Sequence, residues 1–401
     1  MKQKQYTYGK AIKSLFNFAG YKIKEMYFTV KEFYVQLECT RKTSRCPQCN
    51  ARCNRLSETY ERSVRDLNLS SKKCTLFFNE ARIQCKCGFS GFEVIDFVRP
   101  YSRHTIRFEK YIASICRKMT VKDAADTFDL DWKAVKAIDI HYTLEEMCPL
   151  SDLDPKRIGV DEIAYRKGHD YLTVVRDLDL EKVIWLGPKR RKETMDCFFT
   201  ELGPEKSKMI SLVVMDMWDP YIGSVKENCP SASIVFDKFH VVKKINEALD
   251  KVRRAVFASA DKETKLRMKR KRFIILRRKK NLNDKQRESL SDLLQQNEVL
   301  YIGYLLKEQI SDIFEEICEG RAAERLETWF ENVSKSNLKP FMACVKTIKR
   351  YFYGIKNYFK YRVTNAPSEG FNNKINVIKR KAYGYRDLDY FALKIYQSMG
   401  V

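Results

Sequence analysis

The stretch RIGVDEIAYRKGHDYLTVV, residues 157–175, constrains the fold of this chain most, because its pattern predicts a β-hairpin. Apolar Ile158 and Val160 alternate with Gly159 and Asp161, as side chains do on the two faces of a strand. A Lys-Gly-His turn at 167–169 leads into a second apolar run at 171–177, and a third follows at 182–186. Asp161 therefore ends the first strand. An acid in this place is usually a solvated edge or turn residue, so its role depends on other segments.

Two later acids stand in comparable settings. Asp216 ends an apolar strand predicted over 209–215, and Glu369 lies in the first turn of a helix. Strands at 209–215 and 233–236, with helices at 191–202 and 221–227, predict a mixed sheet with a parallel portion. The carboxyl ends of such strands meet at one edge, where open α/β sheets place their sites. Three converging carboxylates suit two Mg²⁺ (or Mn²⁺) ions about 3.5–4 Å apart, as phosphodiester chemistry needs.

The charge of the chain indicates what it binds. Its 401 residues carry a formal net charge of +24, which a polyanionic partner such as double-stranded DNA would neutralise. A chain of this length exceeds one hydrophobic core, so two to four domains are expected. No apolar run approaches the roughly 18 residues that span a bilayer, and the first residues lack the apolar segment of a signal peptide. We therefore expect an intracellular protein with no membrane partner.

Two close cysteine pairs stand apart from the other cysteines. Cys46 and Cys49 form the first pair, and Cys85 and Cys87 follow thirty-six residues later, with alternating segments between them that read as paired strands. Two such knuckles at hairpin tips predict a zinc ribbon with one structural Zn²⁺. The one-residue spacing of the second pair is shorter than zinc knuckles favour, so reduced cysteines without metal remain the alternative. Six scattered cysteines among apolar neighbours are interpreted as small core residues: Cys116, Cys148, Cys197, Cys229, Cys318 and Cys344.

Residues 119–142 predict two short helices around a turn at 129–131. Ala124 and Ala125 permit close packing of the helices, as in a helix-turn-helix, whose second helix lies in the major groove of DNA. That helix would expose Trp132, Lys133 and Lys136. An ordinary helical hairpin fits the pattern equally well, and the preceding cysteine pairs and the basic charge favour DNA binding.

Between His240 and Glu369 lie 128 residues with helical periodicity almost throughout, which predicts an all-α insertion. Within it, residues 265–280 (KLRMKRKRFIILRRKK) hold ten basic residues and no acid. We expect this basic run to contact DNA, through Lys269, Arg270, Lys271 and Arg272 among others. A solvated helix face is the alternative.

The motifs together, in their order, resemble the ISL-three family of bacterial insertion-sequence transposases. The resemblance rests on the cysteine knuckles, the helix pair, GVDEIAYRKGH, VVMDMWDPY, IVFDKFHVVKKIN and SEGFNNKINVIKRKAYGYRD. It implies an RNase H-like core with Asp161, Asp216 and Glu369 as the catalytic triad, and places His240 near the scissile phosphate. Where many related transposases carry a basic residue seven positions beyond the glutamate, this chain has Asn376.

The helix that follows Glu369 carries polar and basic residues on or near one face, which suits contact with bases and phosphates. These residues are Asn372, Asn373, Asn376, Lys379 and Arg380. A solvated amphipathic helix, packed through Phe371 and Ile375, accounts for the same pattern.

The sequence therefore predicts a multidomain α+β DNA transposase: a β-rich zinc-ribbon domain (1–100), a helix-turn-helix domain with linker (101–150), a catalytic core in two parts (151–240 and 356–401) and the all-α insertion (241–355). It would bind the terminal inverted repeats of its element, cleave there and join the end to target DNA, as a homodimer or higher oligomer at the bacterial nucleoid. The alternatives are a sequence-specific DNA-binding regulator with an inactive catalytic fold, and a nuclease without strand transfer.

Overall fold

The computed structural model describes residues 14–166, 170–363 and 366–400, with the side chains of Ser57 and of residues 366–369 left aside. The chain divides into two compact units, Met1–Glu146 and Met147–Val401, which we treat separately. The Lys-Gly-His turn at 167–169 lies outside the described residues.

The first unit begins with a β-sheet in the order β1-β2-β5-β4-β3, in which β6 also pairs with β5. Only β2 and β5 run parallel; the other pairs are antiparallel. The strands are β1 (Tyr21–Phe28), β2 (Glu32–Cys39), β3 (Thr43–Arg45), β4 (Arg52–Leu69), β5 (Lys72–Gln84) and β6 (Ser90–Phe92). Alternate residues of β2 and β5 are buried, so one face forms a core that includes Val35, Leu37, Leu76 and Phe78.

In the described part of this unit, three full helices follow the sheet: α2 (Ile106–Cys116), α3 (Val121–Phe128) and α4 (Trp132–Glu146). The Thr120 hydroxyl caps α3 by accepting a hydrogen bond from the backbone N–H of Asp123 at 3.1 Å. Ala124 and Ala125 are buried in the shared core of the three helices, and Asp129 ends α3 in a left-handed conformation with φ 52°. Small buried side chains between α3 and α4 allow the close approach that the sequence predicted.

The second unit contains a five-stranded sheet in the order β11-β10-β7-β8-β9. Its strands are β7 (Arg157–Ala164), β8 (Tyr171–Asp177), β9 (Lys182–Pro188), β10 (Leu212–Met215) and β11 (Ser233–Phe236). The first three form an antiparallel meander, whereas β10 and β11 run parallel to β7. The predicted mixed sheet with a parallel portion is confirmed.

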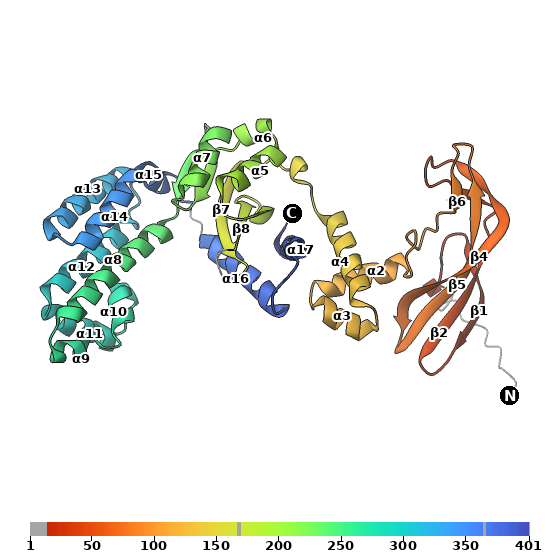
Figure 1. Cartoon of the computed structure of the whole chain (residues 1–401), viewed down its shortest axis with the longest axis horizontal. Helices are drawn as coiled ribbons and strands as arrows, with labels where there is room; N and C mark the ends of the chain where they lie inside the picture. The colour runs from red at the N-terminus through yellow and green to blue at the C-terminus, as the bar shows by residue number, and fades with distance from the viewer. Residues whose placement is uncertain (1–13, 167–169, 364–365, 401) are drawn as a thin grey trace. The chain divides into compact units, whose positions relative to one another are not determined.

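Helices pack on both faces of this sheet. One face carries α5 (Lys192–Leu202), α6 (Pro204–Lys208) and α7 (Asp219–Asn228), and the other carries α16 (Ala366–Lys381) and α17 (Leu388–Met399) (Figure 1). Phe198 and Tyr221 pack against strand residues such as Val213, whereas Ile375, Phe391 and Ile395 pack with Ile163 and other residues of β7–β9. The sheet is therefore buried on both faces, which explains the near-continuous apolar runs of β8 and β10.

Every described element from residue 238 to residue 361 is helical (Figure 1). These helices are α8 (Lys238–Ser259), α9 (Lys262–Met268), α10 (Arg272–Leu276), α11 (Asp284–Gln295), α12 (Glu298–Ile313), α13 (Glu319–Ser336), α14 (Lys339–Arg350) and α15 (Phe352–Tyr361), with the short 3₁₀ turn η2 (Lys279–Asn281) between α10 and α11. A second 3₁₀ turn, η1 (Leu150–Asp152), lies earlier in this unit, before β7. Trp329 lies in their core with 1% of its surface exposed, and its Nε1 donates to the Leu306 carbonyl at 2.8 Å. Within the described chain, we find no helix with the length and apolarity to cross a bilayer.

The interpretation of the six scattered cysteines as core residues is wrong for two of them. Cys116 and Cys229 are buried and Cys148 and Cys344 are half-buried, but Cys197 and Cys318 are exposed. Cys197 lies on the outer face of the amphipathic helix α5, and Cys318 precedes the first residue of α13. Apolar neighbours in the sequence therefore did not indicate which face of a helix each thiol occupies.

Candidate metal sites and nucleic-acid interface

Three parallel strands of the second unit end at one edge of the sheet, and acidic residues gather there. Asp216 follows β10 directly, and Asp237 follows β11 directly. The prediction that Asp161 ends its strand is wrong, because β7 continues to Ala164 by pairing with β8 beyond the end of β10. Because β7, β10 and β11 are neighbours that run in one direction, their carboxyl ends lie together. One carboxylate oxygen each from Asp161, Glu162 and Asp216 falls within 4.8 Å of the others. The sequence predicted two of these three residues, Asp161 and Asp216.

Hydrogen bonds from separate elements orient these carboxylates. Asp161 accepts from the backbone N–H of Glu162 at 2.8 Å and from the Asn372 amide of α16 at 2.9 Å. Asp216 Oδ1 lies 2.7 Å from Nε2 of His240, which stands in the first turn of α8. Asp237 caps that helix by accepting from the N–H of Phe239 at 3.0 Å. His240, which the resemblance places near the scissile phosphate, therefore stands at this acidic edge.

Sequence reasoning missed Glu162 and the residues that hold it. Glu162 Oε1 lies 2.5 Å from Nε of Arg190, and the Arg190 guanidinium stacks 4.3 Å from the ring centre of Trp218. Alternation along β7 places Glu162 on the opposite face from Asp161, but its longer side chain still reaches the cluster. Two adjacent acids within a largely apolar strand were the available signal, and it was not used.

The electrostatics of the cluster follow from burial and from the crowding of acids. Desolvation, with the nearby Asp216 charge, raises the pKa of Asp161. Desolvation also raises the pKa of Glu162 to about 7, although Arg190 opposes the shift. Burial by itself would lower the pKa of His240, but its hydrogen bond to Asp216 and the surrounding negative charges outweigh this and raise the pKa. Positive charge is therefore favoured at this edge.

Residue Glu369, the predicted third carboxylate, belongs to α16 and precedes Asn372 by about one turn. Its side chain is among those that the structure leaves undescribed. On the same helix, Lys379 donates from Nζ to the Ala164 carbonyl at 3.1 Å, and Arg380 bonds to the Asn376 carbonyl of its own helix. Asn373 is exposed. Helix α16 is thus fastened to β7 through two polar contacts, one of which reaches Asp161.

The chemistry of this cluster fits a hard divalent cation. Carboxylate oxygens are the protein ligands that Mg²⁺ and Mn²⁺ prefer. Asp216 is buried and Asp161 is half-buried, and their ligand oxygens already lie close together. Two like charges held this near each other in a poorly solvated place are costly without a compensating cation.

In the first unit the two cysteine pairs come together at two hairpin tips. Cys46 and Cys49 lie between β3 and β4, and Cys85 and Cys87 lie between β5 and β6. The backbone N–H of Cys46 bonds to the Ala51 carbonyl, and that of Cys85 to the Phe89 carbonyl, both at 2.9 Å. Asn50 and Gly88 take positive φ angles of 60° and 93° to close these turns. The one-residue spacing of the second pair thus still builds a knuckle.

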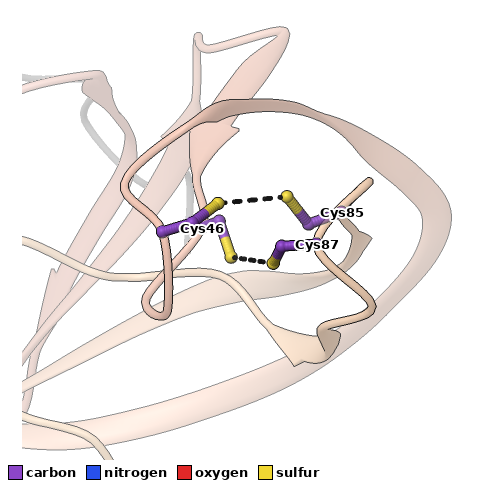
Figure 2. Close-up of side chains that lie close together, drawn as sticks. Cys46, Cys85 and Cys87 are labelled. Carbon is purple, nitrogen blue, oxygen red and sulfur yellow. Dashed lines mark hydrogen bonds between the residues drawn. The ribbon is translucent and has the colours of Figure 1, made fainter.

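The four sulfurs are arranged as one metal would require. Cys46 Sγ lies 3.6 Å from Cys87 Sγ, and Cys49 Sγ lies 3.5 Å from Cys85 Sγ; Figure 2 shows the two knuckles facing each other. Four thiolates bound tetrahedrally to zinc at about 2.3 Å would stand about 3.8 Å apart. A backbone hydrogen bond from Cys87 and contacts with the Cys49 and Cys53 thiols lower the pKa of Cys85 to about 6. The residues fit a structural Zn²⁺.

Two basic surfaces were expected to meet DNA. On α4, Trp132 and Lys133 are exposed, and Lys136 is half-buried. In the basic run, Lys269, Arg270 and Lys271 form the turn between α9 and α10, where Arg270 has a φ of 62°.

Four of the ten cations in the basic run are paired within the chain. Arg267 pairs with Glu263, Arg272 with Asp250, Arg278 with Asp312 and Glu315, and Lys280 with Glu315. Among the described residues, Lys269, Arg270 and Lys271 have no acidic partner. The charge available to a polyanion is therefore concentrated at this turn.

Comparison with known proteins assigns the family. A family model described as a transposase matches residues 158–395. The transposase for insertion sequence element IS1001 of Bordetella parapertussis is 32% identical over 393 residues, which cover 96% of this chain and 97% of that protein. The chain belongs to the ISL3 family of transposases. The transposase for element IS1557 of Mycobacterium tuberculosis is 26% identical to this ISL3 transposase over 369 residues, 84% of this chain and 82% of that relative.

Two further matches assign the first unit of this ISL3 transposase. The helix-turn-helix domain of transposase family ISL3 matches residues 93–143, and the zinc-finger of the IS204, IS1001, IS1096 and IS1165 transposases matches residues 42–87. The predicted zinc ribbon and helix-turn-helix are confirmed, so an ordinary helical hairpin is excluded. The protein is a DNA transposase with a DNA-binding helix-turn-helix.

Proposed function

We propose that this transposase binds the terminal inverted repeats of its insertion sequence, hydrolyses a phosphodiester at each end, and joins the freed 3′ end to target DNA. The observation that carries the proposal is the group of Asp161, Glu162 and Asp216 at one sheet edge, with His240 on Asp216. In the first step a water oxygen bonds to phosphorus and the bond to the 3′ oxygen breaks, leaving a 3′-hydroxyl. In the second step the oxygen of that hydroxyl bonds to the phosphorus of a target phosphodiester, and the bond from this phosphorus to the target's 3′ oxygen breaks, which leaves a 3′-hydroxyl on the target strand.

Asp161, Asp216 and Glu369 are the residues that would hold two Mg²⁺ (or Mn²⁺) ions. When bound, the ions would supply activation of the attacking oxygen and neutralisation of the leaving one. Glu369 is included because it stands three residues before Asn372 on α16, and residues three apart share a helix face. Asn372 contacts Asp161, so this face of the helix looks towards the acidic edge.

The neighbouring residues would act by fixing these carboxylates. Asn372 and the N–H of Glu162 hold the Asp161 oxygens in one orientation, and His240 does the same for Asp216. A misplacement of about 1 Å in such a site costs rate steeply. Arg190 neutralises Glu162, which would otherwise add a negative charge where the phosphate must approach.

DNA would be held by three surfaces with separate tasks. The helix bearing Trp132, Lys133 and Lys136 would read bases in the major groove. The turn Lys269–Lys271, with Arg272 behind it, would grip phosphates regardless of sequence. Near the cleaved bond, α16 would offer the residues named above: Asn372, Asn373, Asn376, Lys379 and Arg380. In the free protein Asn372 and Lys379 bond within the chain, so any DNA contact by these two would require exchange of those bonds.

The larger organisation is also proposed. The sheet of mixed direction is consistent with an RNase H-like core, formed by 151–240 and 356–401 and interrupted by the helices of 241–355. The zinc ribbon (1–100), through Cys46, Cys49, Cys85 and Cys87, would support the helix-turn-helix (101–150). Two element ends must be handled together, which calls for at least a dimer on DNA, acting at the bacterial nucleoid.

The test is a cleavage and joining assay with purified protein, a duplex carrying the element's end, and a target plasmid. We expect Mg²⁺-dependent nicking at the end, followed by covalent joining to the plasmid. Specific binding without nicking would show a regulator with an inactive catalytic fold. Nicking without joined product, at any target concentration, would show a nuclease. Either result would overturn the proposal.

A further inference from the structure

A groove of about 250 Å³ runs along one face of α8 and is closed on one side by α10. Its lining comes from successive turns of α8, with two residues from α10: Phe239, Val242, Lys243, Asn246, Glu247, Asp250, Arg254, Arg272 and Leu276. The transposition chemistry proposed above assigns no role to this groove as a whole.

One end of the groove lies beside the acidic edge. Phe239 immediately precedes His240, whose Nε2 lies 2.7 Å from Asp216, and the two rings meet edge to face with centres 5.6 Å apart. Phe239 is nevertheless 58% exposed. A large aromatic ring left uncovered next to a catalytic edge is available for stacking. With Val242 and Leu276 it gives the groove an apolar wall.

The other end of the groove is positively charged. Asp250 is buried and pairs with Arg253, Arg254 and Arg272 at 2.8, 3.2 and 3.3 Å, so one carboxylate faces three guanidinium groups and leaves a positive excess. Lys269, Arg270 and Lys271 immediately precede Arg272 in the chain. An anion seated here would complete the neutralisation. The groove thus combines an aromatic wall with a cationic end.

Between these ends lies a polar group that needs a partner. The Oδ1 atom of Asn246 is buried and accepts no hydrogen bond from the described residues. A buried acceptor of this kind destabilises the fold unless a donor reaches it. A ligand with an apolar plane, a donor at its edge and an anionic group at one end would satisfy all three parts of the groove.

We propose that this groove takes one unpaired nucleotide of the DNA strand next to the cleaved phosphodiester, an inference that rests on the proposed cleavage of element ends. The base stacks on Phe239, its edge bonds to the Asn246 amide, and its phosphate lies against Arg272 and Arg254. The volume admits a single nucleotide, whereas a duplex is far too wide. Adenine matches best, because an Asn amide can bond to its amino group and ring nitrogen together.

The experiment measures binding of element-end duplexes without added divalent metal, so that no cleavage is required. A single mismatched base is moved through the positions that flank the cleaved bond. Unpairing a mismatched base costs less than unpairing a matched one, so at one position the mismatch should tighten binding by about tenfold. Phe239→Ala should abolish that gain, because stacking of a base on an aromatic ring is lost. Asn246→Leu should remove the preference for adenine over thymine there.

Phe273→Ala is the matched control. Phe273 is an aromatic residue of α10 that is 73% exposed and does not line the groove, so this variant should keep the full mismatch gain. Equal losses in Phe239→Ala and Phe273→Ala, or no position at which a mismatch tightens binding, would overturn the groove assignment. A wild type that shows the mismatch gain but no Mg²⁺-dependent nicking would instead overturn the proposed function alone.

Discussion

The cysteine cluster of the first unit and the carboxylate cluster of the second are both assembled from distant parts of the chain, but their surroundings differ. The four sulfurs chiefly face one another, at 3.5 and 3.6 Å across the two knuckles. Each carboxylate instead has a nitrogen partner from the protein: Asn372 for Asp161, His240 for Asp216 and Arg190 for Glu162. The first arrangement is closed around one ion, and the second leaves oxygens available to metal and substrate.

Because of this difference, we expect metal binding to stabilise the fold of the first unit more than that of the second. The knuckles have little else to hold them together, because among the described residues the core beneath them contains two of the four cysteines, Cys46 and Cys85, with Cys53, Ile83 and Phe89. Metal binding energy there is folding energy. The carboxylate edge rests on a sheet that is buried on both faces, so its fold does not depend on an ion. Four variants test the two units, and they are given from the largest expected effect to the smallest.

Asp216→Asn should lower the rate of end cleavage by about a thousandfold, because the amide removes metal-binding charge worth several kcal/mol while preserving shape. The melting temperature and end binding should stay near those of the wild type. The control is Asp177→Asn at the opposite edge of the sheet, where the buried side chain only accepts backbone bonds from Asp179 and Leu180; it should cleave normally. Strong Mg²⁺-dependent cleavage by Asp216→Asn would remove this residue from the site.

Cys49→Ser should abolish the binding of one zinc per chain and loosen residues 43–92, as measured by elemental analysis and hydrogen exchange. Exchange in the second unit should not change. Cys53→Ala is the matched control, because Cys53 is a buried cysteine of the same region outside the group of four; it should keep its zinc. If Cys53→Ala lost its zinc while Cys49→Ser kept it, Cys53 rather than Cys49 would be the zinc ligand.

In a triple variant, Lys269, Arg270 and Lys271 are each replaced by glutamine. The slope of the logarithm of the DNA-binding constant against the logarithm of the salt concentration should become shallower by about 0.9 per lost phosphate contact. Binding to any duplex should weaken alike, since phosphate contacts carry no sequence information. The matched control replaces Arg278 and Lys280, whose charges already pair with Glu315, and its salt slope should change little. If the two variants lower the slope equally, the turn has no special role.

Glu162→Gln should reduce cleavage by roughly tenfold or less, because Arg190 already neutralises this carboxylate and its loss removes little net charge. Single-turnover cleavage rates at saturating DNA give the measurement. A defect as large as that of Asp216→Asn would rank Glu162 as a metal ligand equal to the two aspartates.

Local patterns predicted much of both sites. Spacing identified the four cysteines, alternation identified β7, short apolar runs identified β10 and β11, and helical periodicity identified the segment of α8–α15. These features depend on neighbours within a few residues. The ends of β7, β10 and β11 could then be placed together because parallel strands share an edge.

What the sequence did not predict depends on contacts between distant residues. The parallel pairing of β2 with β5 is set by burial of one face, which no local pattern encodes. The closeness of Glu162 to Asp216 depends on side-chain length and on Arg190, held in turn by Trp218. Arg267 pairs with Glu263 of its own helix, but the pairing of Arg272, Arg278 and Lys280 required the positions of Asp250, Asp312 and Glu315, which lie outside the basic run.

The contact of Asn372 with Asp161 spans 211 positions of the chain, which sets an order of events during translation. Ribosomes add about 5–20 residues per second, and domains fold as they emerge. The unit with the zinc ribbon and helix-turn-helix is complete at Glu146, long before α16 is synthesised. Each nascent transposase therefore passes through a stage at which the helix-turn-helix unit is complete but the acidic edge of the second unit is not yet closed by α16. A product truncated within α8–α15 would remain in that stage and would occupy element ends in competition with full-length protein.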